Sequence, residues 1–225
     1  MTSGVFLDVD GTLIDNVYFH VIAWYRACRE RGISVTAARL HKLIGMGGDQ
    51  LVHALVGTEM PELDEAHSRH MEPFETEGQV LPGARDLILE LHRQNAHIAV
   101  STSGGATAAR TSLRRVVPDL SFIDTLVTRD DISATKPAPD LIAAALQWSG
   151  LPAHDVMYIG DTSWDVEAAA RCGIRTIGVR TGGWTENELL AAGAIAVYDS
   201  VAQLLAELPS SPLGLMLGNG QRANG

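Results

Sequence analysis

Short apolar runs and longer amphipathic stretches alternate over most of the chain. The short runs stop at glycine or polar residues, as buried parallel strands do, and they predict strands at residues 5–7, 98–100, 125–127, 156–159, 176–179 and 195–197. Apolar residues at helical spacing predict helices at 84–94, 106–116, 140–149, 164–172 and 186–192. Because strand and helix alternate, we expect an α/β fold, a Rossmann-like parallel-sheet core with helices on both faces.

Residues 16–79 interrupt this alternation with helical patterns alone. Asn16 suits the N-cap of the first helix, and the expected helices are 17–31, 37–44, 50–56 and 63–75. We therefore expect an inserted α-helical cap domain over 16–79, between the core segments 1–15 and 80–208. Residues 209–225 are rich in serine, proline, glycine and asparagine and predict a flexible C-terminal tail.

Composition and charge narrow the classes of function. The 225 residues are 46% hydrophobic and 20% charged, which is ordinary for a soluble globular protein. Seventeen lysines and arginines against 27 acidic residues give a net charge of −10, which argues against nucleic acid or an anionic membrane as partner. No apolar run approaches the ~20 residues of a membrane span, and the first residues lack a signal-peptide pattern. We expect a cytoplasmic protein, monomeric or homodimeric, with Cys28 and Cys172 as free thiols.

Polar residues able to carry chemistry stand where the predicted strands end. In chain order these are Asp8 with Asp10, residues 101–104, Lys136, and Asp161 with Asp165. The carboxyl ends of parallel strands meet at one edge of a sheet, and ligands bind there. We therefore expect these residues to form a single site.

The carboxylates of Asp8 and Asp10 indicate a metal. Residues two apart in an extended chain project to the same side, and neighbouring carboxylates repel each other unless a cation intervenes. Mg²⁺ prefers oxygen ligands and accepts retained waters and a substrate phosphate. We expect Mg²⁺ at this position, with Asp161 completing its protein ligands.

The same residues suit chemistry on a phosphate monoester. Asp8 can attack phosphorus, and Asp10 can protonate the leaving oxygen and later deprotonate the attacking water. Lys136 supplies positive charge to the phosphate and to Asp8. Further phosphate-binding groups are expected at a helix start, namely the Thr102 hydroxyl and the backbone N–H groups of Ser103 and Gly104.

Four motifs follow one another in the chain: DVDGTLID over 8–15, the strand-end Thr102, Lys136 within TKPAPD, and GDTSWDVEAA from Gly160. In order and spacing they resemble the motifs of the haloacid dehalogenase-like (HAD) superfamily, over nearly the whole chain except its tail. The resemblance implies that Asp8 is the nucleophile and Asp10 the general acid and base. It implies that Asp8, the backbone carbonyl of Asp10, and Asp161 hold Mg²⁺ with Asp165 in support. Residues 16–79 would close over the core and select the substrate.

Within the superfamily the pattern is most similar to the phosphoglycolate phosphatase-like and β-phosphoglucomutase-like branch. Asp10 argues for phosphoryl transfer, because the dehalogenases lack the second aspartate of the DxD pattern. The segment from Asn16 resembles the first cap helix of the mutases, including His20, which we expect at the substrate. The loop 44–50 lacks the arginine with which mutases hold a second phosphate, and this favours hydrolysis. Thr135 stands before Lys136, at a position where the family frequently has a glycine. Because Lys136 itself is present, this departure hardly affects the assignment of the lysine.

We therefore expect a Mg²⁺-dependent phosphatase that hydrolyses a small phosphorylated metabolite through an aspartyl-phosphate intermediate. Two alternatives stay open, a β-phosphoglucomutase-like sugar-phosphate mutase and a non-catalytic binding module. Among weaker features, the glycine-rich loop 45–48 is expected to face the substrate and 182–184 to form a turn with a packed tryptophan. His67 and His70 lack a third metal ligand, so we expect solvated surface histidines.

Overall fold

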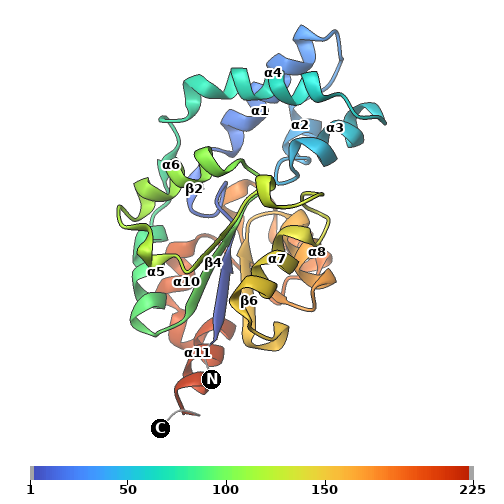
Figure 1. Cartoon of the computed structure of the whole chain (residues 1–225). Coiled ribbons are helices and arrows are strands. Elements are labelled where there is room, and N and C mark those ends of the chain that lie inside the picture. Colours follow the sequence, from blue (N-terminus) through green and yellow to red (C-terminus); the bar gives the residue numbers. More distant parts are fainter. Residues whose placement is uncertain (1–2, 223–225) are drawn as a thin grey trace.

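A computed structural model of the chain describes residues 3–222. Six strands form one parallel sheet in the order β5-β4-β1-β6-β7-β8 (Figure 1). Their bounds are β1 Gly4–Leu7, β4 His97–Ser101, β5 Thr125–Val127, β6 Val156–Gly160, β7 Arg175–Val179 and β8 Ala196–Tyr198. The predicted Rossmann-like sheet is confirmed, and each strand lies within one residue of its expected bounds.

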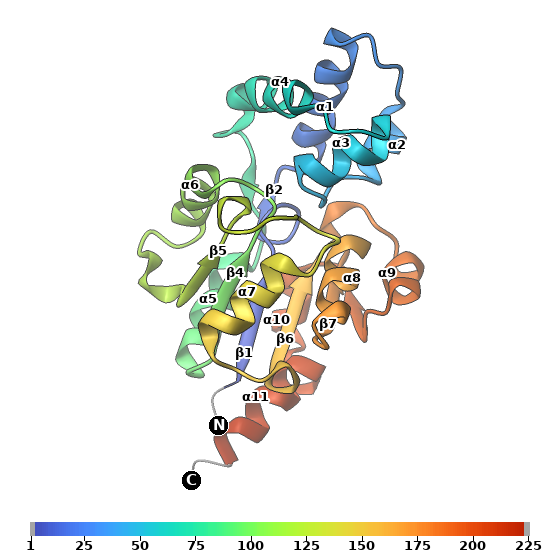
Figure 2. The same ribbon diagram turned by 45° about the vertical axis from the view of Figure 1, so that its right-hand side comes forward.

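Helices cover both faces of the sheet, because successive strand residues point to opposite faces. Val5 and Leu7 belong to one apolar cluster, whereas Phe6 between them belongs to another. The first cluster includes residues of α5 (Ala84–Arg93), α6 (Ala106–Val116) and α10 (Val201–Ala206). The second includes residues of α7 (Asp140–Ser149) and α8 (Ser163–Arg171), and α9 (Glu186–Ala192) packs beside α8 (Figure 2). Burial on both sides explains why β1 and β6 are apolar throughout.

Short 3₁₀ turns join several of these elements. They are η1 Glu72–Phe74, η2 Leu120–Phe122, η3 Arg129–Asp131, η4 Ala153–Asp155, η5 Arg180–Gly182 and η6 Leu208–Ser210. Both cysteines are free, as predicted. Within residues 3–222, no helix has the length and apolar character that crossing a membrane requires.

The remaining helices form a unit with its own apolar cluster, here called the helical module. It contains α1 (Val17–Glu30), α2 (Ala37–His41), α3 (Gly48–Val56) and α4 (Pro61–Met71). Its two connections to the sheet pair with each other as antiparallel strands, β2 (Ile14–Asp15) and β3 (Gln79–Val80). Figures 1 and 2 show the module above the end of the sheet where β1, β4 and β6 finish. Side chains of the module therefore lie opposite the carboxyl ends of the strands.

The C-terminal segment differs from the expected flexible tail. The chain instead forms α11 (Pro212–Arg222), in which Leu213 and Leu217 are buried in the apolar cluster that also holds residues of α5, α6 and α10. The two leucines stand four residues apart, so they lie on one helix face and cover the core. The high content of serine, proline, glycine and asparagine led to the prediction of a flexible tail despite these two leucines. Residues 223–225 lie outside the described part of the chain.

Candidate active site

Acidic side chains from two neighbouring strands meet at the carboxyl edge of the sheet. Asp8 follows β1 directly, and Asp161 follows β6. Because Leu7 pairs with Ile159 in parallel register, the two strands end at the same level. Asp165 approaches from the first turn of α8, and oxygens of the three carboxylates lie within 4.8 Å of one another. The predicted convergence of these residues is present in the structure.

Lys136 lies in the middle of this cluster and is 1% exposed. Its Nζ donates to Oδ1 of Asp8 at 2.5 Å and to Oδ1 of Asp165 at 2.8 Å. Burial opposes the charge of the ammonium, but the two carboxylates outweigh it and raise the pKa of Lys136 well above 10.5. The lysine is therefore cationic, and it fixes the side chains of Asp8 and Asp165.

Asp165 is held by more contacts than its neighbours. Its Oδ2 accepts from the backbone N–H and the hydroxyl of Thr162, which form the capping box of α8. Its Oδ1 accepts from Lys136 and from the hydroxyl of Tyr158 at 3.3 Å. Both oxygens of Asp165 are therefore engaged, one of them by Lys136.

Asp161 has an unsatisfied oxygen. Thr12 donates to Oδ1 at 3.1 Å, but Oδ2 is buried without a hydrogen-bond partner among the described residues. Gly11 and Gly182 approach this carboxylate so closely that a Cβ at either position would clash with Oδ2. The two glycines keep this oxygen unobstructed.

Uncompensated charge makes the cluster suitable for a cation. One lysine faces three buried carboxylates. Burial, followed by the charges of Asp165 and Asp10, raises the pKa of Asp8 to about 7 against the opposing effect of Lys136. Burial and the charges of Asp165 and Asp8 likewise raise the pKa of Asp161 well above 3.8. A small divalent ion with a preference for oxygen would remove this repulsion and bind the free oxygen of Asp161.

Asp10 occupies a different environment, at the entrance rather than the centre of the cluster. Its side chain is 28% exposed, and its Oδ1 accepts from the amide of Asn16 at 2.5 Å and lies 3.8 Å from Nε2 of His20. Burial alone would raise its pKa, but the interactions with His20, Asn16 and Lys136 together lower it below 3.8. Asn16 was expected to cap α1. It occupies the N-cap position, but its side chain makes no cap hydrogen bond and contacts Asp10 instead.

His20 connects Asp10 to His67, which was expected to be a solvated surface histidine. Nδ1 of His20 lies 3.2 Å from Nε2 of His67, whose ring stacks on Trp24 at 4.2 Å between centroids. His67 is half-buried, not solvated as expected, and desolvation lowers its pKa well below 6.5. His70 pairs with Glu30 at 3.0 Å. Only the packing of α4 on α1 reveals the role of His67, because 47 residues separate it from His20.

The loop after β4 also departs from expectation. Thr102 directly follows β4, as predicted, and it is buried; the N–H of Gly104 donates to its hydroxyl oxygen at 3.1 Å. The hydroxyl of Ser103 donates to the carbonyl of Gly45 in the helical module at 3.2 Å. The helix itself begins at Ala106. Thus Gly104 stabilises the loop, and Ser103 contacts the opposite wall of the site.

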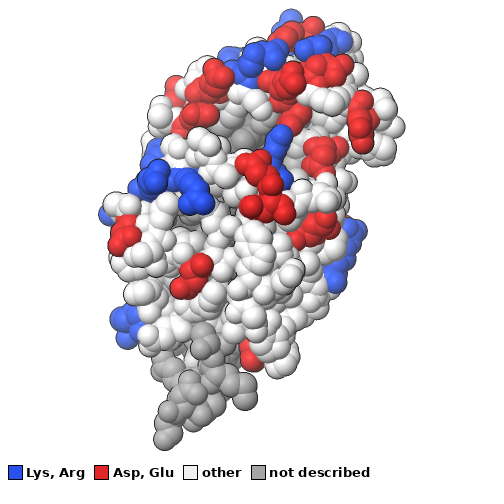
Figure 3. Space-filling view, in the orientation of Figure 1, with Lys and Arg blue, Asp and Glu red and all other residues white. Residues whose placement is uncertain are grey.

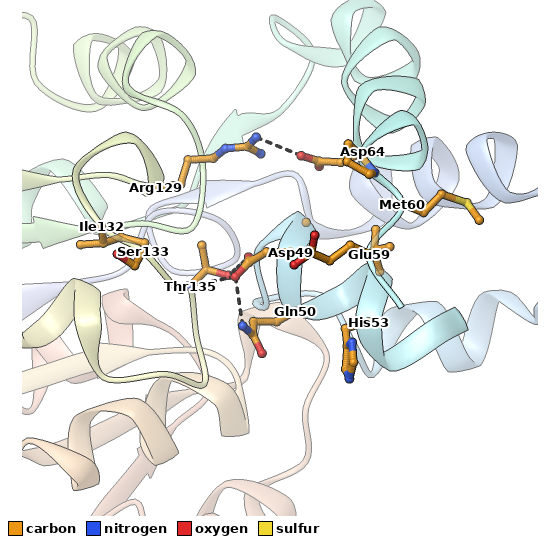
Figure 4. Close-up of a pocket in the computed structure, with 13 residues that line it drawn as sticks. Asp49, Gln50, His53, Glu59, Met60, Asp64, Arg129, Ile132, Ser133 and Thr135 are labelled. Atoms are coloured by element: carbon orange, nitrogen blue, oxygen red, sulfur yellow. Dashed lines mark hydrogen bonds and ion pairs between the residues drawn. The ribbon is translucent and has the colours of Figure 1, made fainter. Parts of the chain in front are cut away.

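Among the cavities between the helical module and the sheet, two adjoin each other. One of 180 Å³ is lined by Asp8, Asp10 and His20 and by the glycine-rich loop 45–48, which the sequence analysis placed at the substrate. A second of 650 Å³ lies beside it, between α3, the start of α4, and the loop before Lys136 (Figure 4). The turn at 182–184 contains the buried Trp184 as expected.

Comparison with known proteins agrees with these motifs. A family model described as haloacid dehalogenase-like hydrolase matches residues 5–179. A phosphoglycolate phosphatase of Vibrio cholerae is 28% identical over 219 residues, covering 88% of this chain and 93% of that protein. Hexitol phosphatase A of Escherichia coli K12 is 28% identical over 183 residues, covering 78% and 82%.

The similarity extends to a longer protein and to a known structure. The chain is 26% identical over 211 residues, 90% of its length, to the chloroplastic protein SUPPRESSOR OF QUENCHING 1 of Arabidopsis thaliana, but spans 20% of that protein. The crystal structure of a hydrolase from Pseudomonas syringae is similar with a TM-score of 0.87 and 36% identity, covering 93% of this chain and 99% of that one. The chain therefore belongs to the haloacid dehalogenase-like hydrolase family.

Proposed function

We propose that the chain is a Mg²⁺-dependent phosphatase that hydrolyses a small phosphorylated metabolite through an aspartyl-phosphate on Asp8. The observation that carries this proposal is the arrangement of Asp8, with Lys136 on one side and Asp10 with His20 at the cavity entrance. Relatives named for phosphoglycolate and hexitol phosphates support a small phosphate ester as substrate.

Asp8 and Asp10 divide the covalent chemistry. An oxygen of Asp8 attacks phosphorus, the bond from phosphorus to the ester oxygen breaks, and Asp10 gives the leaving oxygen a proton. Water then attacks the phosphorus of the acyl phosphate, Asp10 accepts a proton of that water, and the carboxylate of Asp8 is released. The lowered pKa of Asp10 keeps its carboxylate deprotonated and open to a proton, but makes it a weaker base than an ordinary aspartate. The imidazole of His20, 3.8 Å away, can supply the proton that the first step requires.

The donor set proposed for Mg²⁺ consists of Asp8, Asp161 and the backbone carbonyl of Asp10, with Asp165 in support. The buried free oxygen of Asp161 and the raised pKa of Asp8 support this assignment. When bound, Mg²⁺ would offset the negative charges of the phosphate and of Asp8 as they approach. Lys136 contributes a further positive charge, 2.5 Å from Oδ1 of Asp8.

The phosphate is proposed to bind at the loop after β4 and at Lys136. The hydroxyl oxygen of Thr102 accepts from the N–H of Gly104, so its own hydrogen is available to a phosphate oxygen. Ser103 and Gly104 then contribute through the shape of the loop and its backbone. Both residues line the 180 Å³ cavity with Asp8.

The helical module is proposed to be the cap domain, residues 16–79, on a core of 1–15 and 80–208. Several of its contacts with the core are polar. The N–H of Gly47 donates to Thr135, and Lys42 pairs with Glu188 at 2.7 Å. Polar contacts can exchange with water, so the module can open for substrate and close to exclude solvent.

A phosphate-release assay tests the proposal. We expect the wild-type protein to release phosphate from a panel of small phosphomonoesters with Mg²⁺ and to lose the activity in EDTA. Asp8→Asn is expected to lose at least about 10⁴-fold in kcat, because no nucleophile remains. The matched control is Asp15→Asn, an exposed aspartate on β2. Wild-type kcat in a folded Asp8→Asn protein would contradict the proposal.

A further inference from the structure

Arg129 lies where the two cavities meet. It begins η3 immediately after β5 and Thr128, and its N–H donates to the carbonyl of Gly104 at 3.1 Å. This bond fixes the arginine backbone beside the loop proposed to bind phosphate. Its side chain crosses to the helical module and donates to Oδ2 of Asp64 at 2.9 Å (Figure 4). Both Arg129 and Asp64 line the 180 Å³ and the 650 Å³ cavities.

The guanidinium has unused binding capacity. It offers five N–H donors in a planar fork that suits two oxygens of one anion. Among residues 3–222, its side chain makes a single hydrogen bond, the one to Asp64. The side chain is 41% exposed, so a ligand in the cavity can reach the remaining donors.

Arg129 brings a positive charge to the 180 Å³ cavity, whose other charged lining residues are acidic. The described residues that line this cavity include the four acids Asp8, Asp10, Asp64 and Glu75, and Arg129 is the one lysine or arginine among them. Acidic groups also stand on both sides of the boundary between the module and the sheet on the face shown in Figure 3. A second anionic group on a substrate would be repelled elsewhere in the cavity and attracted at Arg129.

Asp64 can give up this contact, because its carboxylate also lies beside the start of α3. It packs against Gly48, where a Cβ would clash with the carboxylate. Gly48 is the first residue of the nine-residue helix α3, and the N-terminus of a helix favours a negative charge. Asp64 therefore stays in a favourable position when Arg129 binds another anion.

We propose that Arg129 selects phosphomonoesters whose leaving group carries a second anionic group, a carboxylate or another phosphate. This inference rests on the proposed phosphatase function. The reacting phosphate lies at Asp8, and the second anion replaces Asp64 on the guanidinium. The 180 Å³ cavity suits a leaving group of a few heavy atoms, and a longer one extends past Arg129 into the 650 Å³ cavity. The arginine that binds the second anion then belongs to the core, because the loop 44–50 of the module contains no arginine.

The test compares three substrates that differ in the leaving group. They are 2-phosphoglycolate with a carboxylate, ethylene glycol bisphosphate with a second phosphate, and 2-hydroxyethyl phosphate, which is neutral at the matching position. The measured quantity is the ratio of kcat/KM for each anionic substrate to kcat/KM for the neutral one. We expect wild type to favour an anionic substrate and Arg129→Gln to lower the ratio about 10- to 100-fold, the range of a charge-assisted hydrogen bond. The two anionic substrates distinguish a carboxylate from a phosphate.

Two further variants separate selection from a purely structural ion pair. Asp64→Asn leaves Arg129 in place and removes its competitor, so the ratio should be kept or raised. If the pair served only to hold the module on the core, Asp64→Asn would lower the ratio as much as Arg129→Gln, and the inference would fail. The matched control is Arg93→Gln, which breaks an exposed Arg–Glu pair on α5 and should leave the ratio unchanged.

Different results would contradict the role of Arg129 and the proposed phosphatase function. A wild-type protein that releases phosphate equally from all three esters, or an unchanged ratio in Arg129→Gln, overturns the inference and leaves the phosphatase function standing. If none of the three esters releases phosphate, the proposed phosphatase function is contradicted. In that case, calorimetric binding of 2-phosphoglycolate and of 2-hydroxyethyl phosphate to wild type and Arg129→Gln still decides whether Arg129 discriminates between them.

Discussion

The carboxyl edge of the sheet and the underside of the helical module face the same cavity, but they are built differently. At the sheet edge, Asp8, Lys136 and Asp161 are at most 5% exposed. Lys136 pairs with buried carboxylates, whereas Oδ2 of Asp161 has no hydrogen-bond partner among the described residues. Across the cavity, His20 and His67 are half-buried and contact each other through one hydrogen bond and a ring stack. Removing a charge from the edge leaves another charge buried and unpaired, whereas a change on the module mostly alters contacts with a ligand. The edge is therefore expected to tolerate substitution less well than the module does.

The largest expected difference between the two regions is the loss of stability when a lysine of each is replaced. Lys136→Met leaves Asp8 and Asp165 without their buried partner, and we expect the free energy of unfolding to fall by about 3–5 kcal/mol. Lys42→Met removes a half-exposed ion pair between the module and Glu188, which is worth about 1 kcal/mol or less. Urea denaturation in EDTA measures both. Equal losses in the two variants would show that burial does not separate the regions.

Metal binding is expected to stabilise the sheet edge specifically. At a Mg²⁺ concentration of about 100 Kd, the free energy of unfolding should rise by about 2.7 kcal/mol, which corresponds to roughly 5–10 °C in Tm for a chain of this length. Asp161→Asn removes the ligand with the free buried oxygen and should abolish most of this shift. Asp64→Asn, on the module, should retain it. A full shift in Asp161→Asn would place the ion elsewhere.

His67 tests the module side without touching the edge. His67→Phe retains a ring to stack on Trp24 but loses the hydrogen bond to His20. We expect kcat/KM on the best small phosphomonoester to fall up to about 10-fold, since one such bond is worth about 1 kcal/mol. The Tm shift with Mg²⁺ should stay the same. Loss of that shift would mean that the two regions are coupled more tightly than their contacts indicate.

The smallest expected effect is a pH dependence at the contact of module and core. Hydrogen bonds from Lys42, then from Thr185, lower the pKa of Glu188 to about 2. A pKa below the unfolded value of 4.5 means that this stabilisation is complete above pH 4.5 and is lost as the pH falls toward 2. Because Glu188 is 37% exposed, its contribution stays below about 1 kcal/mol. Glu188→Gln should therefore be slightly less stable than wild type at pH 6, and the gap should narrow at pH 3. A constant gap would contradict this assignment.

The sequence predicted the sheet edge better than the module for a physical reason. The residues at the edge follow buried strands, so their position along the chain determines their position in space. Asp8 and Asp161 are 153 residues apart, yet strand pairing alone brings them together. The contact of His20 with His67 depends on how α1 packs on α4, and the apolar pattern of each helix does not determine which polar residues meet.

Predictions from local sequence were also wrong where a tertiary contact competed with the local preference of a residue or segment. Asn16 has the residue type of an N-cap, but its amide contacts Asp10. The composition after Leu208 resembles a loose segment, but Leu213 and Leu217 pack on the core and stabilise a helix. Arg129 stands in a polar loop with no motif, and its position between two cavities appears only when the module is in place.

The central claim is that Asp8 becomes covalently phosphorylated, and trapping the intermediate tests it most directly. In Asp10→Asn the acid of the first step and the base of the second are both absent. With Mg²⁺ and 4-nitrophenyl phosphate, whose leaving group needs no proton, the phosphoenzyme should still form and should then accumulate. Acid quenching followed by mass spectrometry should find one added phosphoryl group, located on the peptide that contains Asp8. Asp8→Asn carrying the same Asp10→Asn change should show none. Phosphate release without an adduct, or an adduct on another residue, would contradict the account.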